Sequence, residues 1–252
     1  MASRTIVGWL AALIFGAHAG VVEAVEIKLI SAGAVRAVVS GLAEAFAQET
    51  GHSVKATFGT VGVVRKTLAE QPADVVIVSD VALDDLIKQG AVTGPRTDIA
   101  RAGVGVGVRE GAAKPDIATP DAFKQTILGA KSLVYMDPAQ GATSGIHFAS
   151  VLQRLGIADA VKSKSILWRD GYAAEAVQKG QADLVVHQIS EILPVQGVTL
   201  VGPLPGDLQK ITIYSAGLAS KSTAQDAART FIAYLTRPAS KEKFAGAGLD
   251  FK

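Results

Sequence analysis

Three segments of this chain pass from an apolar strand, through a turn that contains glycine, directly into an amphipathic helix. They are SAGAVRAVV (31–39), FGTVGVVRKTL (58–68) and GATSGIHFASVLQRL (141–155). Alternating strands and helices favour a sheet covered by helices, so we predict an α/β protein. The first backbone N–H groups of a helix lack partners within the helix and carry partial positive charge, so each junction could also hold an anion.

The alternation runs in two blocks, which predicts a two-lobed protein. Apolar runs and helical spacing predict strands at 25–31, 53–59, 73–79, 100–110, 132–137, 164–169 and 182–190, and helices at 36–50, 63–70, 83–89, 120–125, 144–155, 172–179, 222–235 and 238–246. We assign residues 20–104 plus 191–252 to lobe I and residues 105–190 to lobe II, with two crossover strands and a mixed sheet in each. Ligands of such sheets bind beyond the carboxyl ends of the strands.

The first residues have the pattern of a secretory signal. Arg4 is followed by an apolar run from Ile6 to Phe15, which is short for a membrane span, and by the small-x-small triplet Ala17-His18-Ala19. We predict cleavage after Ala19, with a cut after Ala24 or a retained anchor as alternatives. The mature protein is then expected in the periplasm.

Composition narrows the function classes. With no cysteine, the chain can form neither disulfides nor thiolate metal sites, and its formal net charge of +2 does not favour a nucleic-acid partner. The chain has no HExxH, Walker or GxSxG motif, and its histidines lack metal-site spacing. We therefore expect a chain without metal or cofactor, and we further expect a monomer that takes a small anion as its partner.

Four segments in order carry a resemblance to a known family: PADVVIVSD (72–80), YMDPAQGATSGIHFASVLQRLG (135–156), AVQKGQADLVVHQIS (176–190) and FIAYLTRPASKEKFAGAGLDF (231–251). The chain resembles the periplasmic molybdate-binding proteins of ABC transporters. This resemblance implies a type II solute-binding fold, hinge closure around one ligand and delivery to a permease, without chemistry on the ligand.

Together, the junctions and the resemblance predict where the ligand binds. The predicted ligand-binding residues are Gly33, Ala34, Arg36, Thr60, Val61, Thr143, Ser144, Gly171, Tyr172 and His187. Three positions depart from the family: Gly33 and Val61 stand where serines are usual, and His187 stands in place of a tyrosine. Fewer hydroxyls, together with the cations Arg36 and Arg65, favour an organic carboxylate over molybdate.

Each of these residues also has a purely structural interpretation. Ser144 could be an N-cap, His187 a satisfied core histidine and Asp170 a helix cap, while either arginine could face water. If His187 instead contacts the ligand, its usual pKa of roughly 6.5 would let it titrate near neutrality and donate to an anion. The leading hypothesis is a solute-binding protein and not an enzyme. The alternatives are true molybdate or tungstate binding, and an isomerase of unsaturated tricarboxylic acids such as aconitate, with His187 as the base.

Overall fold

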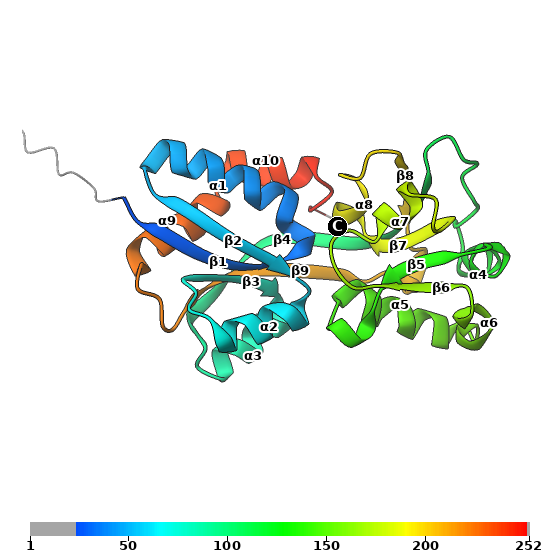
Figure 1. Ribbon diagram of the computed structural model, residues 1–252, viewed down its shortest axis with the longest axis horizontal. Coiled ribbons are helices and arrows are strands. Elements are labelled where there is room, and N and C mark those ends of the chain that lie inside the picture. Colours follow the sequence, from blue (N-terminus) through cyan, green and yellow to red (C-terminus); the bar gives the residue numbers. More distant parts are fainter. Residues whose placement is uncertain (1–23, 251–252) are drawn as a thin grey trace, which may run out of the picture.

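The computed structural model describes residues 24–250, so the predicted signal peptide lies outside the described residues. The protein is an elongated α/β molecule with two halves side by side along its long axis (Figure 1). Strand β4 (Val92–Arg109) runs from one half into the other. No helix within residues 24–250 has the length and apolar character needed to cross a bilayer.

The sheet of the first half has the strand order β2-β1-β3-β9-β4. Strands β2 (Ser53–Gly59), β1 (Glu26–Ala32) and β3 (Val75–Ser79) are parallel, and β9 (Ile211–Ala219) runs antiparallel to both β3 and β4. The prediction of parallel strands is confirmed for the first three, whose connections are helices.

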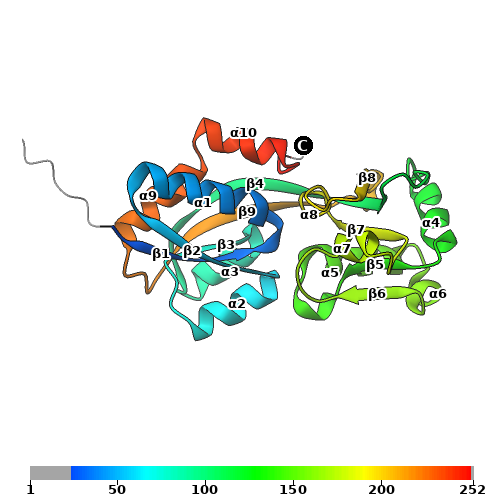
Figure 2. The same cartoon turned by 45° about the horizontal axis from the view of Figure 1, so that its top comes forward.

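Helices cover both faces of this first sheet. Apolar residues on β3 alternate between the faces: Val75 and Ile77 belong to one core cluster, Val76 and Val78 to another. The first cluster packs under α1 (Arg36–Thr50), α9 (Gln225–Leu235) and α10 (Pro238–Gly246), and the second under α2 (Val61–Glu70) and α3 (Asp80–Lys88). Figure 2 shows α2 and α3 on the side of the sheet opposite α10.

The second half repeats this construction. Its sheet has the order β4-β7-β5-β6, with β8 added along β4. The strands are β5 (Leu133–Met136), β6 (Ser165–Trp168), β7 (Leu184–Gln188) and β8 (Val198–Pro203). The helices and 3₁₀ turns that complete the described fold are α4 (Pro120–Gly129), α5 (Thr143–Arg154), α6 (Ala158–Lys162), α7 (Ala174–Gln178), α8 (Ile189–Ile192), η1 (Gly33–Val35), η2 (Pro138–Gln140) and η3 (Gly206–Leu208).

Strand β4 changes partners midway. It pairs with β9 from Val92 to Gly103, and with β7 from Val104 onward. Residues 198–208, which the predicted division placed in lobe I, pair with β4 and pack in the core of the second half. The exact lobe boundaries stay a prediction. The predicted strand 100–110 missed the first eight residues of β4, because residues 93–98 (TGPRTD) lack the apolar alternation that predicts a strand.

Asp74 ties the start of β3 to the chain that follows β9. Its carboxylate accepts hydrogen bonds from Lys28 N (2.8 Å), Ser222 Oγ (2.8 Å), Thr223 N (3.1 Å) and Ala224 N (3.2 Å). Burial alone would raise the pKa of Asp74, but these hydrogen bonds hold it below its usual value.

Replacing Asp74 with asparagine is expected to destabilise the protein by about 1–3 kcal/mol, because buried donors then lose a charged acceptor. A depressed folded-state pKa contributes stability above the unfolded-state pKa of about 3.9, and that stability disappears as the pH falls through the folded-state value. Urea unfolding should therefore show a smaller difference in the free energy of unfolding between the wild type and Asp74→Asn at pH 3 than at pH 7. The exposed Asp159→Asn is the control, and an equal cost at both pH values would contradict the prediction.

Candidate functional site

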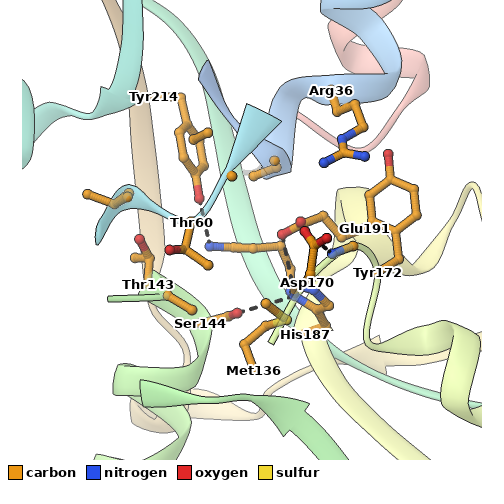
Figure 3. A pocket seen from close by; sticks show the side chains of 18 residues that line it. Arg36, Thr60, Met136, Thr143, Ser144, Asp170, Tyr172, His187, Glu191 and Tyr214 are labelled. Atoms are coloured by element: carbon orange, nitrogen blue, oxygen red, sulfur yellow. Dashed lines mark hydrogen bonds and ion pairs between the residues drawn. The ribbon is translucent and has the colours of Figure 1, made fainter. Parts of the chain in front are cut away.

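A cavity lies between the two halves, at the ends of several strands (Figure 3). Its lining comes from the turns that follow β1, β2, β5 and β6, from the β7–α8 junction, and from the middle of β9. The lining residues are Ala32, Gly33, Ala34, Arg36, Gly59, Thr60, Val61, Met136, Ala142, Thr143, Ser144, Asp170, Gly171, Tyr172, His187, Gln188, Glu191 and Tyr214. All ten predicted ligand-binding residues are among them, so the structure brings the predicted site together in one place.

The start of α5 is open to the cavity. Its N-cap residue, Ala142, has no side chain that could accept from the first N–H groups of the helix. Ser144 is the second residue of α5 and is not its N-cap; its buried hydroxyl lies 3.2 Å from His187 Nδ1. The capping interpretation of Ser144 is therefore wrong, and the first N–H groups remain suited to an anion.

His187 lies at the end of β7 and is only 1% exposed. The backbone N–H of Gln188 donates to its Nδ1 at 2.8 Å, so this nitrogen carries the lone pair and the proton of the neutral ring is on Nε2. Burial lowers the pKa of His187 to about 3. The expectation that His187 titrates near neutrality is therefore wrong, because a charged ring would have to form away from water.

Glu191 lies on α8, four residues after His187 on β7, and was not predicted as a site residue. Its Oε2 lies 3.4 Å from His187 Nδ1. Burial raises the pKa of Glu191 to about 8, although the positive charge of Arg36 acts in the opposite direction. The carboxyl group is therefore protonated at pH 7, which avoids placing a carboxylate against the imidazole lone pair. Gly33 makes room for it, since a Cβ there would lie 3.0 Å from Glu191 Oε1.

Arg36 supplies the cationic group of the cavity. Its guanidinium carbon lies 5.2 Å from the centroid of the Phe58 ring and 5.8 Å from that of Tyr172. Its Nε is buried without a hydrogen-bond partner in the described chain, and none of the ion pairs formed within residues 24–250 includes Arg36. Arg65 differs, because it pairs with Asp85 at 2.8 Å and does not line the cavity.

Tyr214 brings a hydroxyl from β9 to the opposite side of the cavity from Arg36 (Figure 3). It accepts a hydrogen bond from Gln188 Nε2 at 3.2 Å and also hydrogen-bonds to the side chain of Thr143. Burial raises the pKa of Tyr214, so the hydroxyl keeps its proton. Sequence reasoning missed both Gln188 and Tyr214: neither belongs to a glycine-containing junction, and β9 is far away in sequence.

The two halves touch beside the cavity. Thr60 Oγ1 donates to the carbonyl of Gln140, and a Cβ on Gly62 would lie only 2.5 Å from that same oxygen. On the other side of the contact, a Cβ on Gly141 would lie 2.7 Å from the Cα of Gly62. Two glycines therefore allow the backbones of α2 and η2 to meet, so the structure represents a closed arrangement of the halves.

Asp170 also lines the cavity and is labelled in Figure 3. It accepts a hydrogen bond from the backbone N–H of Gly171 at 2.8 Å, within its own loop. The helix that follows begins only at Ala174, so the cap interpretation of Asp170 is wrong. No cluster of three or more potential metal-ligating side chains occurs in the part of the chain that the structure describes.

Residues 27–250 match the family model described as "Bacterial extracellular solute-binding protein". The chain belongs to this family. A solved relative in fold is the periplasmic molybdate-binding protein of Azotobacter vinelandii, with a TM-score of 0.75 and 21% identity over 90% of this chain and 99% of that chain. PEB3 of Campylobacter jejuni, solved with L-phospholactate bound, has a TM-score of 0.67 and 18% identity over 90% of this chain and 100% of that one.

In sequence, this solute-binding protein is also similar to an enzyme. The aconitate isomerase of a Pseudomonas species is 31% identical over 231 residues, which are 88% of this chain and 87% of that protein. Proteins that share this fold thus include one named for molybdate and one solved with L-phospholactate, and the relative in sequence carries the name of a catalyst. The chemistry of the site residues in this chain is therefore needed to distinguish binding from catalysis.

Proposed function

We propose that this solute-binding protein closes its two lobes over a small organic polycarboxylate in the periplasm. The observation that supports this most directly is Arg36, a half-buried guanidinium that faces the cavity without a carboxylate partner in the described chain. Arginine matches a carboxylate with two parallel hydrogen bonds. The uncapped start of α5 and the Tyr214 hydroxyl offer donors for a second carboxylate.

Closure supplies the rest of the proposed mechanism. The ligand would contact both lobes at once, so binding would favour the arrangement in which Thr60 meets Gln140. A closed protein differs in shape from an open one, which gives a membrane permease a way to recognise the loaded form. The periplasmic location of related proteins supports the same location here.

A thermal-shift panel tests the proposed ligand class. Citrate, cis-aconitate and trans-aconitate are each expected to raise the melting temperature, because a ligand at 100 times its Kd stabilises the folded state by about 2.7 kcal/mol. Molybdate, tungstate and sulfate are expected to have little effect, and calorimetry would then give the affinities. Tight binding of molybdate with none of the tricarboxylates would refute the proposal.

An isomerase is the second candidate function, favoured by Glu191. A buried carboxyl group beside the ligand cavity, with its pKa near neutrality, is a common property of acid–base catalysts. The relationship to an aconitate isomerase supports the same chemistry. NMR of the purified protein with cis-aconitate should show the trans isomer forming. Substrate that stays unchanged after prolonged incubation would refute the isomerase and leave binding as the proposed function.

A further inference from the structure

We propose that Glu191 is the residue that transfers a proton to and from the ligand, and that His187 is a positioning residue which holds the Glu191 carboxyl group. This inference rests on the proposed tricarboxylate site and gives it a specific reaction. It replaces the earlier hypothesis in which His187 is the base. The geometry of the two side chains distinguishes their roles.

Neither ring nitrogen of His187 is available to accept a proton from a ligand. Its Nδ1 accepts from Gln188 N at 2.8 Å and lies 3.2 Å from Ser144 Oγ. Its Nε2 is buried, with no hydrogen-bond partner among residues 24–250. A base needs a free lone pair within hydrogen-bond distance of the proton it removes. The lone pair of Nδ1 is directed to Gln188 N, and Nε2 carries the ring proton.

Glu191 has one oxygen toward His187 and the other toward the cavity. Oε2 is the oxygen 3.4 Å from His187 Nδ1, whereas Oε1 faces Gly33, a lining residue that has no side chain. Figure 3 shows Glu191 between Arg36 and His187. A ligand carboxylate held by Arg36 would therefore bring its neighbouring carbon toward Glu191 Oε1.

The proposed reaction is a shift of one proton along three carbons of an unsaturated tricarboxylate. The Glu191 carboxylate removes a proton from the methylene group, the C–H electron pair forms a new double bond to the central carbon, and the electrons of the old double bond move to the far carbon. The negative charge spreads onto a carboxylate that Arg36 holds. Glu191 then delivers a proton to the far carbon of the three, and this proton can exchange with solvent while the carboxyl group holds it. The double bond thus moves by one position without an oxidant or a reductant.

The conformation of the bound methylene arm decides whether the new double bond is cis or trans. Rigid donors at both ends of the ligand would fix that conformation, and the lining provides them on opposite sides of the cavity. The charged and titratable groups around Glu191 are Arg36, Asp170, Tyr172, His187 and Tyr214. Arg36 is the only cation among them at neutral pH, since burial keeps His187 uncharged.

The test compares the wild-type protein with Glu191→Gln, which keeps the size of the side chain and removes the base. With cis-aconitate in D2O, NMR follows both the trans isomer and deuterium entering the substrate. The variant is expected to lose both signals by about 100- to 10,000-fold, while citrate still raises its melting temperature. Glu110→Gln, an exposed position outside the cavity, is the matched control.

A pH series separates the two roles. For the wild-type protein, kcat/KM is expected to rise with pH and level off above about 8, because only the Glu191 carboxylate can accept the proton. His187→Asn is expected to keep measurable exchange with a shifted midpoint, as a positioning role requires. Loss of exchange in His187→Asn together with its retention in Glu191→Gln would reverse the assignment.

The remaining outcomes also decide the question. If the wild-type protein binds citrate and cis-aconitate but neither converts the substrate nor exchanges its protons, the proton-transfer role fails and the binding function stands. If no tricarboxylate raises the melting temperature, the proposed function fails and the inference fails with it. Exchange in Glu191→Gln within tenfold of wild type would overturn the inference alone.

Discussion

Replacing Arg36 with methionine is expected to weaken tricarboxylate binding by at least about 100-fold. The change leaves an apolar chain against Phe58 and Tyr172 but removes the guanidinium, the proposed counter-charge in the cavity. Removing one partner of a buried ion pair costs about 3–5 kcal/mol, and each 1.4 kcal/mol is a factor of ten in affinity. Isothermal titration calorimetry with citrate measures the change.

Arg65→Met is the matched control for this experiment. Arg65 is also on a helix next to the cavity lining, but its charge is paired with Asp85. Its replacement should leave the citrate affinity within about twofold of the wild type. Equal losses in the two variants would mean that overall positive charge attracts the ligand, and Arg36 would then have no specific role.

Replacing Gly62 with alanine is expected to weaken ligand binding by roughly 10- to 100-fold without unfolding the protein. The added methyl group would lie 2.5 Å from the carbonyl oxygen of Gln140, so the two halves could not meet as they do here. Overpacking of this kind costs about 1–3 kcal/mol. The cost falls only on the closed form, because Gly62 and Gln140 belong to different halves.

Small-angle X-ray scattering and calorimetry can follow this effect together. Saturating citrate should reduce the radius of gyration of the wild-type protein, whereas Gly62→Ala should stay extended at the same ligand concentration. Gly41→Ala is the control: a Cβ there meets nothing within 4 Å, and the change in a helix interior should add about 0.5–1 kcal/mol of stability. Wild-type affinity in Gly62→Ala would show that closure does not depend on this contact.

The positions of the turns that line the cavity could be predicted because local sequence determines them. Glycine and hydroxyl residues between a strand and a helix place backbone N–H groups at the carboxyl end of the strand, whatever the rest of the chain does. The turns at Gly33, Thr60 and Ser144 therefore appear in one cavity, as expected.

The electrostatic character of the site could not be predicted in this way. Glu191 lies four residues after His187, and the turn from β7 into α8 brings the two side chains together. Its protonation depends on burial against Gly33 and on the distance to Arg36, which are properties of the assembled fold. The same burial removes the charge expected on His187. Tyr214 reaches the cavity only because β9 crosses the sheet beside β3.

The position of β9 also has a consequence for how the protein is made. Residues 211–219 lie between β3 and β4, so these two strands cannot obtain their final neighbours until most of the chain has been synthesised. Pairings between distant segments form slowly. A polypeptide with this order should remain unstructured while it emerges from the ribosome, which would keep it competent to be threaded through a narrow translocation channel before it folds.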